Sequence, residues 1–301
     1  MCEPHYSFPP ELLDEVASYL HGWDSFTKRH PLYAFSLVSR SWNASACVWI
    51  FHTIHINHAK ETTRFLDLLC KSPHVQAYVK VLALSLEYSL RTGGPDEQPE
   101  VQEKPEWSSF LDKLANKVPH LHTFELSRLQ WDQTSADARR ALTTHFNHAC
   151  RLHLRACNLG RYTGLDALLL PFSRLEALGV YHTSFQLGQA WITIELPERG
   201  HDPDPKMSLR LLDLNASHSY APFIKWTLAR TALEDLVGLA LESVSKADFE
   251  SVGALLRALG PLRHLQRLRL TPYYTIGDPF QAGELVIQVL MLLVRLIGYG
   301  S

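Results

Sequence analysis

The sequence lacks the features of a secreted, disulfide-stabilised protein. Its five cysteines are odd in number and scattered: Cys2, Cys47, Cys70, Cys150 and Cys157. Such a set is not a disulfide framework and is typical of a reducing compartment. The first residues also lack the basic region and apolar run of a secretory signal. We therefore expect a cytoplasmic or nuclear protein.

An excess of charge and the common catalytic motifs are also missing. The net charge is −2 over 301 residues, and no basic stripe is interleaved with aromatic residues, so nucleic acid is not an expected partner. Phosphate-binding glycine loops, nucleophile elbows and His-Glu-x-x-His pairs are absent. We expect a non-catalytic protein that needs no cofactor.

The longest apolar run, residues 284–297, is interrupted only by Gln288 and Arg295. It is shorter than the roughly 20 residues that a membrane span needs, so we expect a buried helix and no membrane partner. In proteins built of stacked repeats, the last repeat normally carries a polar outer face. This apolar helix instead predicts an apolar edge. Either the natural cap is missing, or the edge binds a partner.

What the sequence does contain, in its first fifty residues, is a pattern of short helices. Pro10 suits the first turn of a helix, and the acidic residues after it suit the positive end of the helix dipole. Four apolar residues then recur at helical spacing: Leu12, Leu13, Val16 and Leu20. Residues 31–51 repeat this arrangement. A unit of about 40 residues cannot bury all its apolar surface, so a partner or the rest of the chain must cover the remainder.

These segments resemble the F-box, by which substrate receptors attach to the small adaptor subunit of SCF-type ubiquitin ligases. The resemblance rests on Pro9-Pro10-Glu11-Leu12-Leu13 with Val16 and Leu20, and on Leu37-Val38-Ser39-Arg40-Ser41-Trp42. Residues 51–56 are similar to the segment directly after the box in fungal F-box-like proteins. Phe8 stands where Leu is usual, and the connection over residues 21–31 is long and polar.

By position, the resemblance implies eight adaptor-binding residues: Pro9, Pro10, Leu12, Val16, Leu20, Leu37, Val38 and Trp42. The alternative is an ordinary amphipathic helical cap on the next domain of the chain.

One apolar pattern recurs through the rest of the chain. Each copy has an apolar residue, a second three positions later and a third two positions after that. The copies are Val79/Leu82/Leu84, Leu121/Phe124/Leu126, Ala149/Leu152/Leu154, Leu175/Leu178/Val180, Leu209/Leu212/Leu214, Leu236/Leu239/Leu241 and Leu265/Leu268/Leu270. Leucine-rich repeats of about 20–29 residues, each with a strand and a returning helix, fit most of the steps between copies.

Two polar, proline-rich insertions, residues 91–106 and 197–207, explain the two longest steps. Helix candidates lie between the copies at residues 107–117, 134–147, 220–229 and 246–259. The chain is therefore predicted to be α/β. An all-α F-box-like module at residues 1–58 precedes an irregular leucine-rich-repeat solenoid at residues 59–301, with parallel strands on the concave side and helices on the convex side.

In each Leu-x-Leu strand the leucines point inward and the residue between them points outward. The outward residues of stacked strands form one concave surface, which repeat proteins use to bind partners. We predict a target-binding surface made of His153, Arg155, Tyr181, Asp213, Asn215, Arg267 and Arg269, accompanied by Glu125 and Glu242. The alternative is a strand face that is simply solvated.

One cluster has the residue types of a zinc site: His145, His148, Cys150, His153 and Cys157. Zinc ligands usually come as pairs from two separate points of the chain, whereas this segment is a strand with Cys150 facing inward. A buried thiol beside solvated imidazoles is favoured, and no metal is expected. His52, His55 and His58 are interpreted as edge or turn residues.

The resemblance implies a substrate-recognition subunit of an SCF-type ubiquitin ligase. Its F-box would bind the adaptor and, through it, the cullin, while the repeats bind a target protein and other subunits transfer ubiquitin. Two alternatives remain. The first is a leucine-rich-repeat interaction scaffold with no ligase role. The second is a hydrolase or metal enzyme in the His-rich middle of the chain.

Overall fold

The structure, a computed structural model, describes residues 8–21, 31–86, 107–160, 162–184, 207–215, 220–259 and 264–272. The predicted helix at residues 284–297 and the predicted insertions lie outside the described residues, apart from Met207 at the end of the second insertion.

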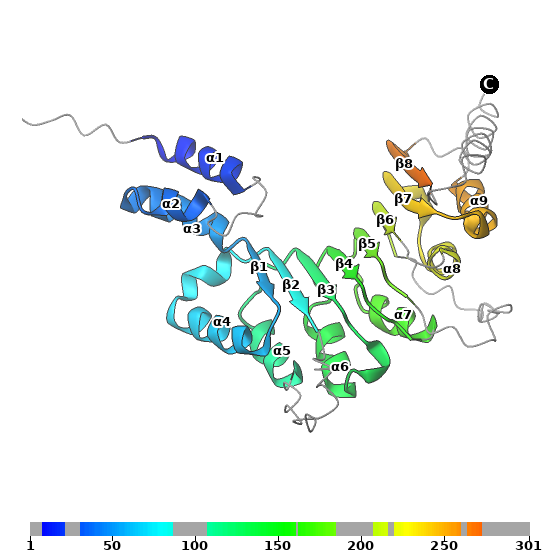
Figure 1. The fold of residues 1–301 in the computed structure, drawn as a ribbon, viewed down its shortest axis with the longest axis horizontal. Coiled ribbons are helices and arrows are strands. Elements are labelled where there is room, and N and C mark those ends of the chain that lie inside the picture. Colours follow the sequence, from blue (N-terminus) through cyan, green and yellow to red (C-terminus); the bar gives the residue numbers. More distant parts are fainter. Residues whose placement is uncertain are drawn as a thin grey trace, which may run out of the picture.

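Within the described residues, eight strands form one parallel sheet in which every strand pairs with the next one along the chain. They are β1 (Thr53–Ile56), β2 (Val81–Ser85), β3 (Thr123–Ser127), β4 (Arg151–Arg155), β5 (Ala177–Tyr181), β6 (Leu211–Asn215), β7 (Gly238–Val244) and β8 (Arg267–Pro272). The sheet curves into an arc, with the strands on its inner side (Figure 1). The predicted α/β class is confirmed.

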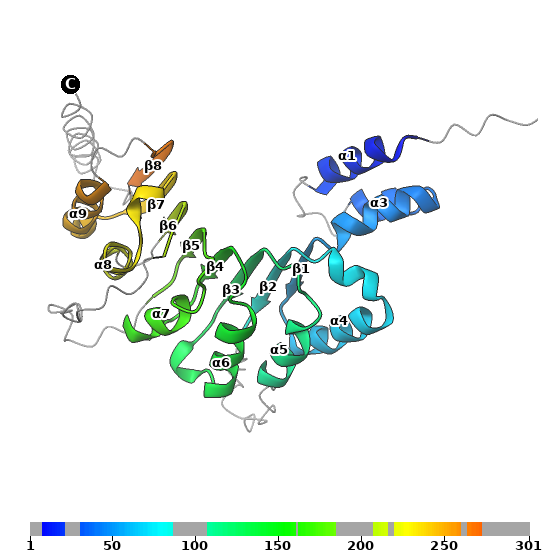
Figure 2. The same ribbon diagram turned by 180° about the vertical axis from the view of Figure 1, so that it is seen from behind.

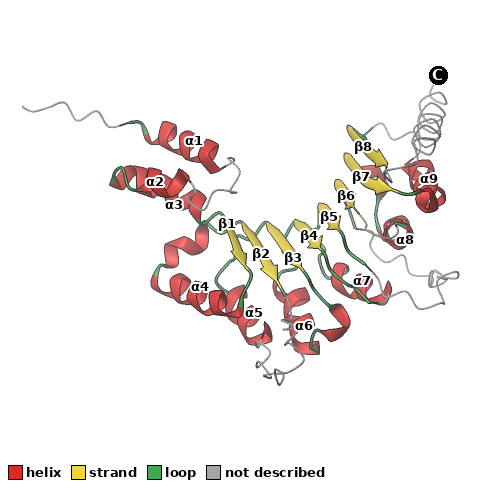
Figure 3. Cartoon of the chain, viewed as in Figure 1, coloured by secondary structure: helices red, strands yellow, loops and turns green. Residues whose placement is uncertain are grey.

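Among the described residues, helices occupy every connection between neighbouring strands except that between β5 and β6, and they lie on the outer side of the arc (Figures 1 and 2). The α-helices are α4 (Ala59–Lys71), α5 (Trp107–Ala115), α6 (Ala136–His145), α7 (Tyr162–Leu169), α8 (Ala221–Arg230) and α9 (Phe249–Leu259). Short 3-10 helices add η1 (Pro73–Ala77), η2 (Trp131–Gln133), η3 (Leu233–Asp235) and η4 (Lys246–Asp248). All four predicted helices are present, as α5, α6, α8 and η4 with α9. Figure 3 shows the resulting layers of strand and helix.

The seven predicted apolar copies coincide with β2 to β8, and their leucines align across the sheet. One row of paired residues runs Leu82, Phe124, Leu152, Leu178, Leu212, Leu239 and Leu268. A second row runs Leu84, Leu126, Leu154, Val180, Leu214, Leu241 and Leu270. From β2 to β7 these side chains are buried in one continuous core between sheet and helices. Burial of the leucines, rather than intrinsic strand preference, therefore sets the register.

Strand β1 is an eighth copy of the apolar pattern, which the sequence interpretation did not identify. Ile54 and Ile56 pair with Leu82 and Leu84 and so extend both apolar rows. Because residues 51–56 come directly after the helical segment, the resemblance assigns them to its tail. The strand precedes the predicted boundary at residue 58, and it belongs to the sheet.

The first helices form a separate small cluster: α1 (Pro10–His21), α2 (Pro31–Ser36) and α3 (Arg40–Ile50). We call these three helices the helical module. Among its described residues, the buried apolar core consists of five side chains, namely Leu13, Ala17, Leu32, Phe35 and Ala46. The rings of His21 and Trp49 lie 5.3 Å and 5.4 Å from that of His52, just before β1. These contacts attach the module to the first edge of the sheet.

Candidate functional site

The helical module exposes large apolar side chains. Leu12 and Val16 are 48% and 44% exposed on α1, while Leu37 and Val38 are 85% and 60% exposed between α2 and α3. Pro9 and Pro10 are exposed as well. Six of the eight predicted adaptor-binding residues therefore lie on the surface. Phe8, Tyr19 and Tyr33 are further large exposed side chains of the module.

Local structure explains why these residues point outward. Leu13 and Ala17, four residues apart, occupy the buried face of α1, so Leu12 and Val16 fall on another face. Ser39 caps α3, because its hydroxyl oxygen accepts a hydrogen bond from the backbone N–H of Trp42 at 3.4 Å. This cap ends the turn that carries Leu37 and Val38, and it holds both side chains away from the five-residue core.

The other two predicted adaptor residues lie deeper. Leu20 and Trp42 are half-buried against the core of the module. The Trp42 ring packs 4.4 Å from Phe35 and meets Phe8 edge-on at 5.8 Å, measured between ring centroids. Trp42 therefore shapes the exposed surface rather than projecting from it.

The predicted target-binding residues share the solvent side of the sheet, which we call the inner face. His153 and Asp213 lie in one row of paired residues, with Gly179 between them. In the next row Arg155, Tyr181 and Asn215 are consecutive. Arg269 continues the first row beyond Ala240, whereas Arg267, the first residue of β8, pairs with Gly238 in the adjacent row. Arg267 thus lies two residues before Arg269 on the same strand.

Contacts link most of these side chains into a polar chain across the sheet. The Arg155 Nε lies 2.7 Å from Glu125 Oε1, and its guanidinium carbon lies 4.7 Å from the centre of the Tyr181 ring. The Tyr181 hydroxyl donates to Asp213 Oδ2 at 2.8 Å.

Further along, Asn215 Nδ2 donates to Glu242 Oε2 at 3.1 Å, and Glu242 Oε1 pairs with Arg269 Nη1 at 2.9 Å. Because these side chains already hold one another in place, a target would bind a preorganised surface, in which Asp213 Oδ1 is a buried polar atom without a partner among the described residues.

Charge and burial shift the pKa values of two side chains on the inner face, Glu125 and Tyr181. Burial raises the pKa of Glu125, but the His153 imidazole and the Arg155 guanidinium outweigh it and leave that pKa below its usual value. Burial and the hydrogen bond to Asp213 raise the pKa of the Tyr181 phenol. Glu125 therefore stays ionised and Tyr181 stays a hydrogen-bond donor at neutral pH.

The cluster considered for zinc is dispersed by the fold. His145 pairs with Asp112 on α5 at 2.9 Å, and His153 faces Glu125 on the inner face. Cys157 is buried, donates to the carbonyl oxygen of Leu126 at 3.3 Å, and has a pKa raised to about 12 by burial. Among the described residues, no three His, Cys, Asp or Glu side chains are grouped to hold a metal ion.

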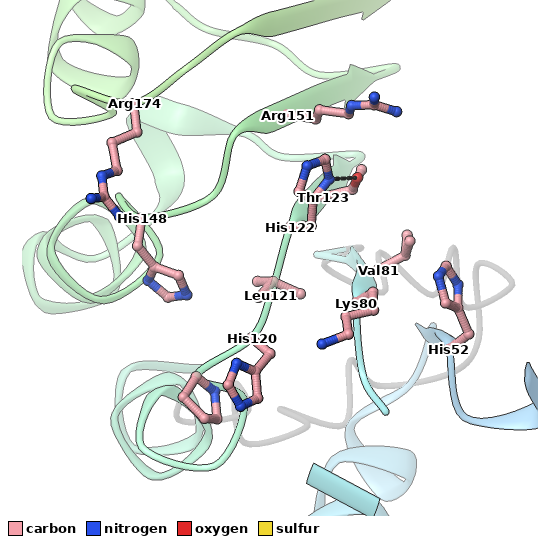
Figure 4. A pocket seen from close by; sticks show the side chains of 11 residues that line it. His52, Lys80, Val81, His120, Leu121, His122, Thr123, His148, Arg151 and Arg174 are labelled. Atoms are coloured by element: carbon pink, nitrogen blue, oxygen red, sulfur yellow. Dashed lines mark hydrogen bonds between the residues drawn. The ribbon is translucent and has the colours of Figure 1, made fainter. Parts of the chain in front are cut away.

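A second surface feature is a pocket of about 720 Å³ at the starts of β2, β3 and β4. Its charged and titratable lining is basic only: His52, Lys80, His120, His122, His148, Arg151 and Arg174. Figure 4 shows these side chains arranged around one hollow, on the first strands and the turns before them. We call it the basic pocket.

Sequence reasoning missed the basic pocket, although a signal was present. Each strand carries one residue in each of the two apolar rows, such as Leu82 and Leu84 in β2. Two positions before the first of these residues, β1, β2 and β3 have His52, Lys80 and His122. Four positions before it, β3, β4 and β5 have His120, His148 and Arg174. An alignment of the copies by their leucines would have shown that both sets of basic residues lie at the same edge of the sheet.

No protein-family model matches the chain, and no curated protein matches it in sequence. Within the described part of the chain, none of the helices has the length and hydropathy to cross a membrane.

Proposed function

We propose that the protein is the substrate-recognition subunit of an SCF-type ubiquitin ligase, in which the helical module binds the adaptor and the inner face binds a target. The exposure of Leu12, Val16, Leu37 and Val38 on a module with a five-residue core carries this proposal. Fully burying one such side chain contributes about 1.5–3 kcal/mol, so a partner that covers all four gains substantially. Exposed apolar clusters of this kind mark interaction surfaces.

The units of the sheet support the interpretation as leucine-rich repeats. We call each strand with the segment that follows it a unit. Four units have a positive φ at the same place, four positions after the strand residue of the apolar row that begins with Leu82. These residues are Arg128 (57°), Ala156 (50°), His182 (51°) and Ser243 (65°). These are uncommon conformations for residues with a Cβ. Their recurrence at one position indicates a single turn repeated along the solenoid.

The next position supports the same interpretation. The Cys157 thiol donates to the carbonyl oxygen of Leu126, and the Thr183 hydroxyl donates to that of Leu154 at 3.4 Å. Both side chains thus bind the backbone of the preceding unit from equivalent places. The leucine-rich-repeat pattern has Asn or Cys at this place, where Thr183 supplies a comparable donor.

The mechanism is proximity. A target held on the inner face and an adaptor held by the helical module share one chain, which raises the effective concentration of a target lysine near the activated ubiquitin. On this proposal no side chain of the protein takes part in the chemistry.

Binding of the purified full chain to the purified SCF adaptor subunit tests the proposal. The double variant Leu12→Asp/Val38→Asp places charges in the proposed contact, and we expect at least about a hundredfold loss of affinity, since each tenfold corresponds to about 1.4 kcal/mol. Leu170→Asp is the matched control, because Leu170 is 45% exposed but follows α7, far along the chain from the module. We expect this control to bind like the wild type.

Circular dichroism spectra of the variants would show whether each is folded. If the folded wild type does not bind the adaptor, the ligase role is wrong and the interaction-scaffold alternative replaces it. Equal loss in Leu170→Asp would also contradict the proposal, because the effect would then be non-specific.

A further inference from the structure

The basic pocket is built from two columns of basic side chains that the sheet register brings together. Lys80 N and Val81 N both donate to the His52 carbonyl oxygen, and His122 N and Thr123 N both donate to that of Lys80. The backbone therefore fixes His52, Lys80 and His122 as neighbours along the edge. His120, His148 and Arg174 occupy the turns beneath them, and Arg151 opens β4 beside His122.

The charges of the basic pocket have no acidic partner in the described structure. Lys80, Arg151 and Arg174 take part in none of the ion pairs formed between described residues. The Nε2 atom of His148 is buried without a hydrogen-bond partner there. Cations gathered in a hollow repel one another, and burial together with the charge of Lys80 lowers the pKa of His52. An anion in the hollow would relieve this repulsion.

Compensation of helix dipoles does not explain the cluster. The preceding helices end at Ala115, His145 and Leu169, whereas His120, His148 and Arg174 lie three to five residues further on. Dipole effects fall off within the last turn of a helix. These basic side chains therefore line the hollow without a helix dipole to balance.

We propose that the basic pocket binds a small phosphate-bearing ligand with two or more phosphate groups. Neighbouring parallel strands lie about 4.8 Å apart, so the basic side chains at the edges of β1 to β4 span about 14 Å. One tetrahedral oxyanion reaches only donors within about 3 Å of its oxygens and would leave most of these groups unpaired. Arg and Lys are the usual phosphate ligands, and a pocket of about 720 Å³ falls in the range of small-molecule sites.

Isothermal titration of the full chain with inorganic tripolyphosphate at fixed ionic strength tests the proposal. We expect saturable binding, and at least about tenfold weaker binding of sulfate, which carries a single tetrahedral group. Lys80→Gln/Arg174→Gln should weaken tripolyphosphate binding by about tenfold or more. Lys113→Gln/Arg210→Gln is the matched control: it removes the same charge from exposed residues outside the pocket, and it should change the affinity by less than about twofold.

Proton linkage gives a second readout. His52 is faced by His21 from α1, by Trp49 from α3, by Lys80 from the start of β2 and by its neighbour Thr53. An anion in the pocket favours the protonated imidazole, so the pKa of His52 should rise on binding and the affinity should increase as the pH falls. Both can be measured by NMR titration of the imidazole signals with and without tripolyphosphate.

Failure of the folded wild type to bind tripolyphosphate would overturn the proposal. Equally weakened tripolyphosphate binding in Lys113→Gln/Arg210→Gln would also overturn it, because the effect would then come from net charge alone. Sulfate binding as tight as that of tripolyphosphate would contradict a ligand with several phosphates.

Discussion

At the scale of single residues, Gly179 determines where the Tyr181 ring can lie. A Cβ at this position would stand 2.8 Å from Tyr181 Cε2, 2.9 Å from its hydroxyl oxygen and 3.0 Å from His153 Cδ2. The missing side chain leaves a path by which the tyrosine reaches Asp213, whose other carboxylate oxygen is buried without a partner in the described structure. The polar chain on the inner face therefore depends on a glycine that makes no polar contact of its own.

We predict that Gly179→Ala displaces Tyr181 and breaks its hydrogen bond to Asp213. Leaving that buried carboxylate unsatisfied should lower the free energy of unfolding by about 1–3 kcal/mol, measured by urea denaturation. In a Tyr181→Ala background the clash with the tyrosine is gone and only the 3.0 Å approach to His153 Cδ2 remains, so the same substitution should cost clearly less stability than in the wild type. An equal loss of stability in both backgrounds would contradict this explanation.

The inner-face residues could be predicted from the sequence, but their partnerships could not. Period-two alternation places His153, Arg155 and Tyr181 on one face without further information. The contact from Tyr181 to Asp213 joins residues 32 positions apart and depends on the gap at Gly179. Such pairings depend on side-chain shape across neighbouring strands, which a pattern along one strand does not contain.

At the scale of elements, α7 and α8 are tied by one carboxylate. Asp166 Oδ1 on α7 accepts a hydrogen bond from the indole N–H of the buried Trp226 on α8 at 2.8 Å. Its Oδ2 lies 3.3 Å from Arg230 Nη2. Since these helices belong to separate units, Asp166 links two repeats on the outer side of the sheet.

We predict that Asp166→Ala lowers the free energy of unfolding by about 1–3 kcal/mol, because it leaves the Trp226 N–H without its acceptor in a buried site. The matched control is Asp137→Ala on α6, whose ion pair with Arg140 is exposed. Exposed pairs contribute about 0–1 kcal/mol, so this variant should be close to wild type in the same urea titration. If Asp166→Ala and Asp137→Ala lost similar amounts of stability, burial of the Asp166 contacts would not explain the effect.

Sequence reasoning missed β1 and α7 for different reasons. β1 has the apolar spacing of the other strands, with Phe51, Ile54 and Ile56. It directly follows the helical segment, and the resemblance to the F-box assigned residues 51–56 to the tail of that segment. The helix α7 contains Gly164, whose Cβ would meet the Leu159 carbonyl oxygen at 2.2 Å. A glycine that lowers helix propensity is thus required there by close packing, and tertiary contact overrides the local signal.

At the scale of the whole molecule, the sheet is assembled only from neighbours. Each strand pairs with the strand before and after it, so two strands, β1 and β8, have a single partner among the described elements. Burial follows the same order. Leu126, Leu154 and Val180 on the central strands are fully buried, whereas Leu268 and Leu270 on β8 are half-buried. In such quasi-one-dimensional proteins, stability is close to a sum of units and their interfaces.

This architecture predicts a gradient of backbone stability along the chain. Amides of β3, β4 and β5, each held between two strands over a buried core, should exchange hydrogen slowest, and amides of β8 should exchange fastest among the strands. Hydrogen–deuterium exchange followed by mass spectrometry of the full chain measures this order directly. Contact with the helical module through His52 should make β1 slower than β8, although both lie at an end of the sheet. Exchange at one common rate in all strands would mean that the sheet opens as a single cooperative unit, and the nearest-neighbour description would then be wrong.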